Sequence, residues 1–205
     1  RALNEQVLRL RQDDPITLDI QGRDHLHTRH HDVMLEAAAT SLQIHLQLPP
    51  ARSVRYYNSA MILSAPLLAV SANSPYLFGP DLWDETRIPL FEQAVAVSPR
   101  AESRANRVTF GHAYVRQSLM QCFEENLTDY AVLLPTPLQT PPESLAHLRL
   151  HNGTLWRWNR PLIGFDDAGA PHLRLEHRVM PAGPSLVDML ANAALFYGLI
   201  QQLAT

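Results

Sequence analysis

Apolar and polar residues alternate along several short stretches of the chain, and this period of two predicts β-strands. Residues 41–48, SLQIHLQL, place leucine or isoleucine at every second position. Residues 15–20, PITLDI, show a shorter form of the same pattern. In residues 172–179, HLRLEHRV, four ionisable side chains fall on one face, because successive side chains of a strand point to opposite sides: His172, Arg174, Glu176 and Arg178.

Apolar residues at helical spacing predict helices in four other stretches, 2–11, 51–72, 112–126 and 185–203. Pro66 is expected to kink or interrupt the second of them. In the last, Ser185 is expected to cap the N-terminus, with Asp188 in a near capping box. The alanine-rich residues that follow the polar loop expected at 22–31 also favour a helix.

The stretches between these elements predict turns and loops. Asn152 and Gly153 lie between two alternating runs and predict a β-hairpin. Residues 73–107 are rich in proline and polar residues and are expected to form a long loop, such as a lid or a wall of a substrate site. Strands interspersed with helices predict an α+β fold, with an antiparallel sheet and helices packed on one face. We expect residues 1–205 to form a single domain.

Composition narrows the function classes. Apolar residues make up 46% of the 205 residues, which is enough for a sizeable core. The chain has no lysine, so a phosphate-binding P-loop lysine and a Schiff-base lysine are both excluded. A net charge of −3 argues against a nucleic-acid partner. No stretch approaches the roughly 20 apolar residues that span a bilayer, so we expect no membrane partner. The single cysteine, Cys122, fits a reducing cytoplasm and is expected to pack in the core.

The charged face of strand 172–179 is the main candidate for chemistry. The ordinary interpretation is that this face meets solvent while the apolar face packs on helices. The alternative is a ligand site, since Arg174 and Arg178 would flank Glu176. Arginine binds phosphate oxygens through a planar fork, and Mg²⁺ prefers a few carboxylate oxygens completed by substrate phosphates and waters. Such a face could hold Mg–ATP without a glycine-rich loop.

Other clusters allow two interpretations each. The histidine-rich HLHTRHH, with His25, His27, His30 and His31, could bind zinc, but no HExxH motif is present and the spacing fits no standard zinc site. A polar loop or substrate wall is the favoured interpretation there. Trp156 and Trp158 are expected to pack in the core. Arg157 and Arg160 could instead extend the cationic surface. His112, His147 and His151 are expected to be structural or surface histidines.

Two segments of the chain resemble a known family in their order and residues. LRLEHRVMPAGPSLVDMLANAALFYGL is similar to the closing strand and helix of the type 2 glutamate–cysteine ligases, and TSLQIHLQLPPARSVRYYNSAMILSAPLLAVSANSPYLFG to their histidine strand, long helix and SANSP signature. GRDHLHTRHHDVMLEAAATS and HNGTLWRWNRPLIGFD look closest to a divergent branch. The resemblance runs from about residue 15 to 203.

The resemblance implies a glutamine synthetase-like catalytic domain and an ATP- and Mg²⁺-dependent reaction that joins a glutamate-like carboxylate to an amine through an acyl phosphate. Glu176 would be a Mg²⁺ ligand, Arg178 would contact the nucleotide or the acyl phosphate, and His45 would lie beside the metal and phosphates. The remaining candidates are Arg174 and Asn73 for the nucleotide, and Arg55 and Asn58 for the substrate wall. Asn73 could equally be a cap or turn residue. A homo-oligomer is compatible with this assignment.

One family feature has no counterpart in the sequence. Family members begin with an acidic G-x-E-x-E strand, whereas ITLDIQGRD offers only Asp19. We expect that strand to lie upstream, in a larger ligase of which these residues are the C-terminal part, or to have been lost. In both cases we expect the 205 residues alone to be inactive. The alternatives are a non-catalytic remnant that binds small molecules or oligomerises, and a histidine-based metallohydrolase.

Overall fold

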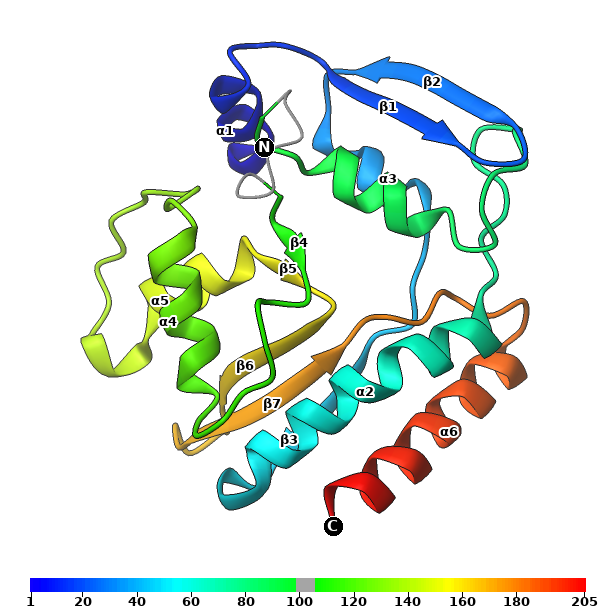
Figure 1. Cartoon of the computed structure of the whole chain (residues 1–205). Helices are drawn as coiled ribbons and strands as arrows, with labels where there is room; N and C mark the ends of the chain where they lie inside the picture. The colour runs from blue at the N-terminus through cyan, green and yellow to red at the C-terminus, as the bar shows by residue number, and fades with distance from the viewer. Residues whose placement is uncertain (99–105) are drawn as a thin grey trace. The chain divides into compact units, whose positions relative to one another are not determined.

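The computed structural model describes residues 1–98 and 106–205 of the chain (Figure 1). The chain divides into two compact units, each built from three segments. The first unit comprises Arg1–Thr40, Asn73–Thr109 and Asp129–Trp156; the second comprises Ser41–Ala72, Phe110–Thr128 and Arg157–Thr205. The expectation of a single domain stays a prediction.

A three-stranded antiparallel sheet forms the centre of the second unit. Its order is β3 (Ile44–Leu48), β7 (Pro171–His177) and β6 (Asn159–Phe165), with β7 in the middle. Two long helices, α2 (Ser53–Ser71) and α6 (Leu186–Ala204), pack against each other, and Figure 1 shows them running side by side. The alternation at 41–48 and 172–179 therefore gave the right elements, and both helices were predicted correctly.

The apolar face of this sheet and the two helices share one core. Because side chains alternate along a strand, Leu175 and the neighbouring Ile44 and Leu48 point to the same side of the sheet. These three residues join one buried cluster with residues of α2 and α6: Tyr56, Tyr57, Ala60, Leu63, Leu67, Phe196, Ile200 and Ala204. An antiparallel sheet with helices on one face is the α+β architecture predicted from the sequence, and the prediction is confirmed.

A buried polar network lies within this core. His177 shares a 2.7 Å hydrogen bond between its Nδ1 and Oδ1 of Asn159, and the Asn159 amide donates to the Ser64 hydroxyl at 2.8 Å. The imidazole also stacks on Phe196, with ring centroids 4.4 Å apart. These hydrogen bonds offset part of the cost of burying the polar groups, while the buried Nε2 of His177 forms no hydrogen bond with the described residues. The network therefore links the sheet to both helices and fixes how they pack.

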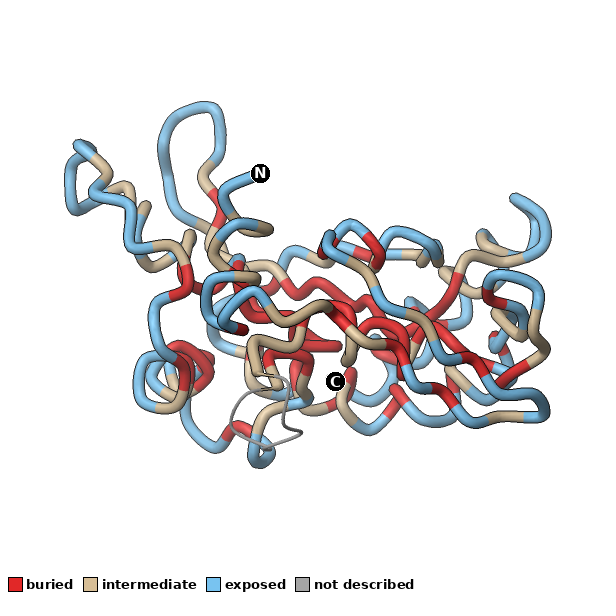
Figure 2. The backbone as a smooth tube through the Cα atoms, turned by 90° about the horizontal axis from the view of Figure 1, so that it is seen from above, coloured by how far each residue is buried: buried red, intermediate tan, exposed pale blue. Residues whose placement is uncertain are grey.

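Helix α6 is apolar over most of its length but is largely exposed. Ser185 caps its N-terminus by accepting a hydrogen bond from the Asp188 N–H, as predicted. By length and composition it could cross a membrane, with a mean hydropathy of 1.2 over eighteen residues. Few of its residues are buried, and Figure 2 shows the exposed positions along the chain in pale blue. Such a helix is weak evidence for a membrane, because the same composition occurs in helices that pack in a protein core.

A third helix and a 3₁₀ turn complete the second unit. The 3₁₀ turn η2 (Pro50–Arg52) leads into α2, which continues past Pro66. Helix α4 (Met120–Asp129) begins eight residues later than the predicted 112–126. Cys122 lies on its buried side, and burial raises the pKa of the thiol. The expected core role of this cysteine is confirmed.

The first unit is built around a β-hairpin. Strands β1 (Ile16–Gln21) and β2 (His25–His30) pair antiparallel, and β1 packs on helix α3 (Arg87–Ala94), as Figure 1 shows. Helix α1 (Ala2–Leu10) and the 3₁₀ helix η1 (Val33–Ala38) also belong to this unit. The hairpin buries Ile16, Leu18, Ile20 and Leu26 on one face. The other face is polar.

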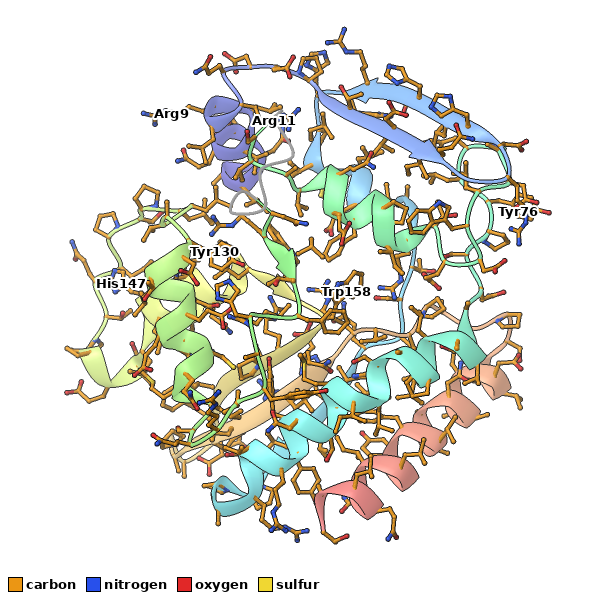
Figure 3. All side chains as sticks on the ribbon, viewed as in Figure 1. Arg9, Arg11, Tyr76, Tyr130, His147 and Trp158 are labelled. Atoms are coloured by element: carbon orange, nitrogen blue, oxygen red, sulfur yellow. The ribbon has the colours of Figure 1, made fainter. Side chains whose placement is uncertain are left out.

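The remaining elements are short. Strand β4 (Val108–Thr109) pairs with β5 (Trp156–Arg157). The 3₁₀ turn η4 (Pro142–Ser144) precedes helix α5 (Ala146–Gly153). Trp156 and Trp158 are both buried, as expected, and Trp158 is labelled in Figure 3.

Four local predictions were wrong. The hairpin expected around Asn152 and Gly153 is instead the last turn of α5, whose C-cap is Thr154. The loop expected at 22–31 contains β2, since its buried Leu26 packs with the core although its neighbours are polar. The alanine-rich stretch forms only the 3₁₀ helix η1. The loop expected at 73–107 contains α3, and residues 99–105 of it lie outside the described part of the chain.

Candidate functional site

The polar face of the β3–β7–β6 sheet brings three of the charged residues of the sequence into one row. In the strand register, Glu176 on β7 lies opposite His45 on β3 and opposite Arg160 on β6. Directly opposite residues on neighbouring antiparallel strands point to the same face and have Cβ atoms about 5 Å apart. The row is therefore fixed by strand pairing, and the side chains meet because they occupy matching positions.

Glu176 is the centre of this row. Its side chain is 2% exposed, and its Oε2 accepts two hydrogen bonds from Arg160, from Nη2 at 2.7 Å and from Nε at 3.2 Å. Arg178 approaches the other oxygen, with its Nε 3.6 Å from Oε1. The His45 imidazole is 40% exposed, and its Nε2 lies 3.9 Å from Oε2. A buried carboxylate is stable here because guanidinium groups surround it.

A second row, one step along the sheet, carries Arg174. Its register partners are Gln47 on β3 and Leu162 on β6. Gly164 leaves room for the polar side chains of β7, since a Cβ there would come within 2.5 Å of the His172 ring and 3.1 Å of Arg174 Nη2. Two buried side-chain atoms of these rows form no hydrogen bond with the described residues: the Nε of Arg174 and the Oε1 of Glu176.

The charge balance of this face is positive. Arg160, Arg174 and Arg178 bring three permanent positive charges, and Glu176 is the sole acidic residue in the sequences of β3, β6 and β7. With histidine neutral, the face keeps two positive charges in excess. A partly buried surface of this kind attracts anions more strongly than a solvated one, because the low dielectric weakens screening. Its chemistry suits phosphate groups.

Two predicted substrate residues lie elsewhere in the second unit. Arg55 and Asn58 are on α2, which packs against the apolar face of the sheet. Arg55 donates from Nη1 to the Thr205 carbonyl at 2.9 Å. Asn58 binds the backbone of Val115 twice, accepting from its N–H at 3.0 Å and donating to its carbonyl at 2.8 Å. The structure does not bring these two side chains into the row around Glu176. Asn73 is exposed and begins a segment of the first unit.

Arg157, the other arginine that could have extended the cationic surface, has a different environment. Its guanidinium is 1% exposed and binds Glu125 at 2.8 Å and the Asn126 side chain at 2.8 Å. Burial alone would lower the pKa of Arg157, but the charges of Tyr57, Cys122 and Glu125 raise it. The group also lines an open pocket of about 210 Å³, together with His112, Tyr114, Gln121, Cys122, Glu124 and Glu125. None of the predicted site residues lines that pocket.

Arg160 is the residue whose role the sequence left open. The sequence predicted only that Arg160 could extend the cationic surface. In the structure Arg160 holds Glu176 in place through two hydrogen bonds. Its position follows from the β6–β7 register, and a correct prediction of β6 as the partner of β7 would have found it. The sequence instead predicted a hairpin around Asn152 and Gly153, and it did not predict that β6 pairs with β7.

The family model of glutamate–cysteine ligase family 2 matches residues 19–205 of the chain. The chain belongs to this family. No curated protein and no solved structure matches it. Family membership agrees with the resemblance drawn from the Glu176 strand, the His45 strand and SANSP, and it identifies the chain as ligase-like.

Proposed function

We propose that this member of the glutamate–cysteine ligase family contributes the nucleotide-binding surface of an ATP- and Mg²⁺-dependent carboxylate–amine ligase. The observation that carries the proposal is the polar sheet face, where Arg160 and Arg178 contact one buried carboxylate and Arg174 lies in the next row. Nucleotide phosphates carry the complementary charge, and the arginine forks match their oxygens. Family membership supports the same class of reaction.

The arginines have separate roles in this proposal. Arg160 is engaged with Glu176 and acts as a positioning residue. Arg174 and Arg178 are the phosphate-binding groups, because the buried Nε of Arg174 has no hydrogen bond and Arg178 places its guanidinium beside Glu176, with Nε 3.6 Å from Oε1. Neutralising phosphate charge favours attack by a carboxylate, since the attacking group is itself an anion.

Glu176 is the proposed metal ligand. Its Oε2 is occupied by Arg160, but Oε1 is buried and has no hydrogen bond. A carboxylate oxygen that is ion-paired with Arg178 but forms no hydrogen bond could serve as one ligand of a Mg²⁺ ion that takes its other ligands from phosphates, water and residues outside these strands. When bound, Mg²⁺ would offset the charge of the phosphates and orient them. His45, half-exposed at the edge of the row, would contact the phosphates.

The reaction that fits this surface makes an amide in two steps. An oxygen of a glutamate-like carboxylate attacks the γ-phosphorus of ATP and the bond to the β-phosphate oxygen breaks, giving an acyl phosphate and ADP. The amine nitrogen then attacks the acyl carbon, phosphate leaves with the C–O electrons, and the nitrogen loses a proton. Here the chain's residues bind and orient the charged groups, and none of them forms a covalent bond.

A non-catalytic remnant is the second candidate, and one observation favours it. A single carboxylate on the three strands gives a sparse metal site, and the arginines already compensate its charge. A remnant would use this face to bind an anionic small molecule without turning it over. The two candidates differ in whether Glu176 takes part in binding through Mg²⁺.

Calorimetric titration of ATP into the protein, with and without Mg²⁺, separates the candidates. Glu176→Gln should lower the affinity for ATP about tenfold with Mg²⁺, equivalent to about 1.4 kcal/mol, and change it little when Mg²⁺ is absent. Arg174→Gln should weaken binding under both conditions, because the guanidinium acts on the phosphates directly.

The matched control is Glu124→Gln, at an exposed position of α4, which should bind ATP as the wild type does. Circular dichroism should show that all three variants are folded. If Glu176→Gln binds Mg–ATP with wild-type affinity while folded, the ligase proposal fails and the remnant stands. If Arg174→Gln also binds normally, this face is not an anion site of either kind.

A further inference from the structure

The polar face of the β1–β2 hairpin in the first unit gathers two histidines and a carboxylate. His25 and His27 are two apart on β2, so both point to the same face of the hairpin. Asp19 on β1 lies directly opposite His27 in the register, and its neighbour Gln21 lies opposite His25. The side chains of Asp19, His25 and His27 are each about half exposed or more.

Each histidine of this group approaches the Asp19 carboxylate, although the three donor atoms do not all lie within 4.8 Å of one another. His25 Nε2 lies 2.7 Å from Asp19 Oδ1, and His27 Nδ1 lies 3.7 Å from Asp19 Oδ2. The two imidazole centroids are 6.4 Å apart. Two imidazoles on one tetrahedral zinc have centroids roughly 5 Å apart, because each Zn–N bond is about 2 Å. Small rotations of exposed side chains would close that gap.

The backbone beneath these side chains is held firmly. The Gln93 side chain on α3 binds the backbone of Asp19 twice, accepting from its N–H at 2.8 Å and donating to its carbonyl at 3.1 Å. Trp83 donates from its indole N–H to the Gln21 carbonyl at 2.8 Å. The opposite face of β1 is buried through Ile16, Leu18 and Ile20. A rigid strand that presents ligands at a fixed spacing loses little freedom when a metal binds.

We propose that Asp19, His25 and His27 form a binding site for one divalent transition-metal ion, such as Zn²⁺, Ni²⁺ or Cu²⁺. Two imidazoles and a carboxylate are ligands that these ions accept, whereas Mg²⁺ prefers oxygen ligands alone. Water would fill the open positions, since the face is exposed. The zinc interpretation of the sequence covered His25, His27, His30 and His31 together, whereas the strand register brings His25 and His27 to one face and adds Asp19.

Nearby charges permit this site. Arg29 lies on the same face, next to His27 along β2, and would oppose a cation. Its Nη2 is 3.8 Å from an oxygen of Asp14, which offsets that charge. In the absence of metal, Asp19 shares a hydrogen bond with His25 and lies 3.7 Å from His27, and these contacts would be exchanged for metal bonds. The site is independent of the proposed ligase reaction, and its failure would leave that proposal standing.

Calorimetric titration of chelator-treated protein with Zn²⁺, and separately with Ni²⁺, tests the site. Wild-type protein should bind one equivalent that the double variant His25→Gln/His27→Gln does not bind, or binds at least tenfold more weakly. Asp19→Asn should weaken the same equivalent several-fold, because the amide is a poorer ligand. Mg²⁺ should give no saturable binding that depends on these residues.

The matched control is His31→Gln, an exposed histidine that directly follows β2 and lies outside the group. It should bind Zn²⁺ and Ni²⁺ as the wild type does. The proposal is overturned if the double variant keeps the wild-type stoichiometry and affinity, or if His31→Gln loses as much binding as the double variant. All replaced side chains are exposed, so circular dichroism should report a wild-type fold in each variant.

Discussion

The two polar strand faces of this protein carry similar residues in very different surroundings. On β7, Glu176 is 2% exposed and surrounded by guanidinium groups. On the β1–β2 hairpin, Asp19 is 63% exposed and pairs with His25 and His27. Each face alternates with a buried apolar face, so the sequence pattern is the same in kind. What differs is how much of each polar face is withdrawn from water.

Alternation along a strand therefore defines its two faces, but it does not determine how deeply each face is buried. A buried carboxylate requires charged partners, because leaving water costs several kcal/mol. An exposed carboxylate needs none, and its ion pairs contribute little. Arginine therefore surrounds the acid on β7, while histidine suffices on the hairpin. The first arrangement suits phosphate, and the second suits a transition metal.

The largest expected effect comes from breaking the buried pair. Arg160→Met should lower the free energy of unfolding by about 3 kcal/mol, because it leaves Glu176 buried without its closest partner. Urea unfolding followed by circular dichroism measures this change. The matched control is Arg23→Met, which removes an exposed arginine that pairs with Asp81 and Asp84 and should cost less than about 1 kcal/mol. Equal effects of the two substitutions would contradict the contrast drawn between these faces.

The smallest expected effect concerns the exposed face and its dependence on pH. Hydrogen bonding from His25 lowers the pKa of Asp19 below its ordinary value of 3.8. A lowered pKa in the folded state contributes stability above that ordinary value and loses it as the pH falls through the lowered one. Asp19→Asn should therefore unfold at a slightly lower temperature than the wild type at pH 5, and at the same temperature near pH 2. A difference in melting temperature that does not change between these pH values would show that the ion pair plays no part.

Much of the fold could be predicted from the sequence, at the stretches where a single local pattern indicated one kind of element. Strict alternation identified β1, β3 and β7, and a long apolar run with a serine cap identified α6. Near Asn152 the hairpin signal of the Asn-Gly pair failed, because both residues lie in the last turn of α5. Strand β2 was hidden because only Leu26 among its residues is buried, so its pattern resembled a polar loop.

The candidate site was only partly predictable. Glu176, Arg178 and His45 lie together as expected, because they share one face of neighbouring strands. Arg160 required the β6–β7 pairing, which no local pattern specifies. Arginine also has structural uses in this chain: Arg11, labelled in Figure 3, donates to the carbonyls of Asp14, Pro15, Ala96 and Ser98. Residue type alone therefore could not tell a phosphate ligand from a structural arginine.

The proposed function depends on the binding of a metal–triphosphate at the polar face of the β3–β7–β6 sheet. Its most direct test uses Mn²⁺ in place of Mg²⁺, bound to ATP, and records the paramagnetic broadening of backbone amide signals in an assigned NMR spectrum. We expect the strongest broadening at residues 45, 160, 174 and 176, all on that face. Broadening confined to α2, α6 or the β1–β2 hairpin, with the signals of these four residues unchanged, would contradict the claim.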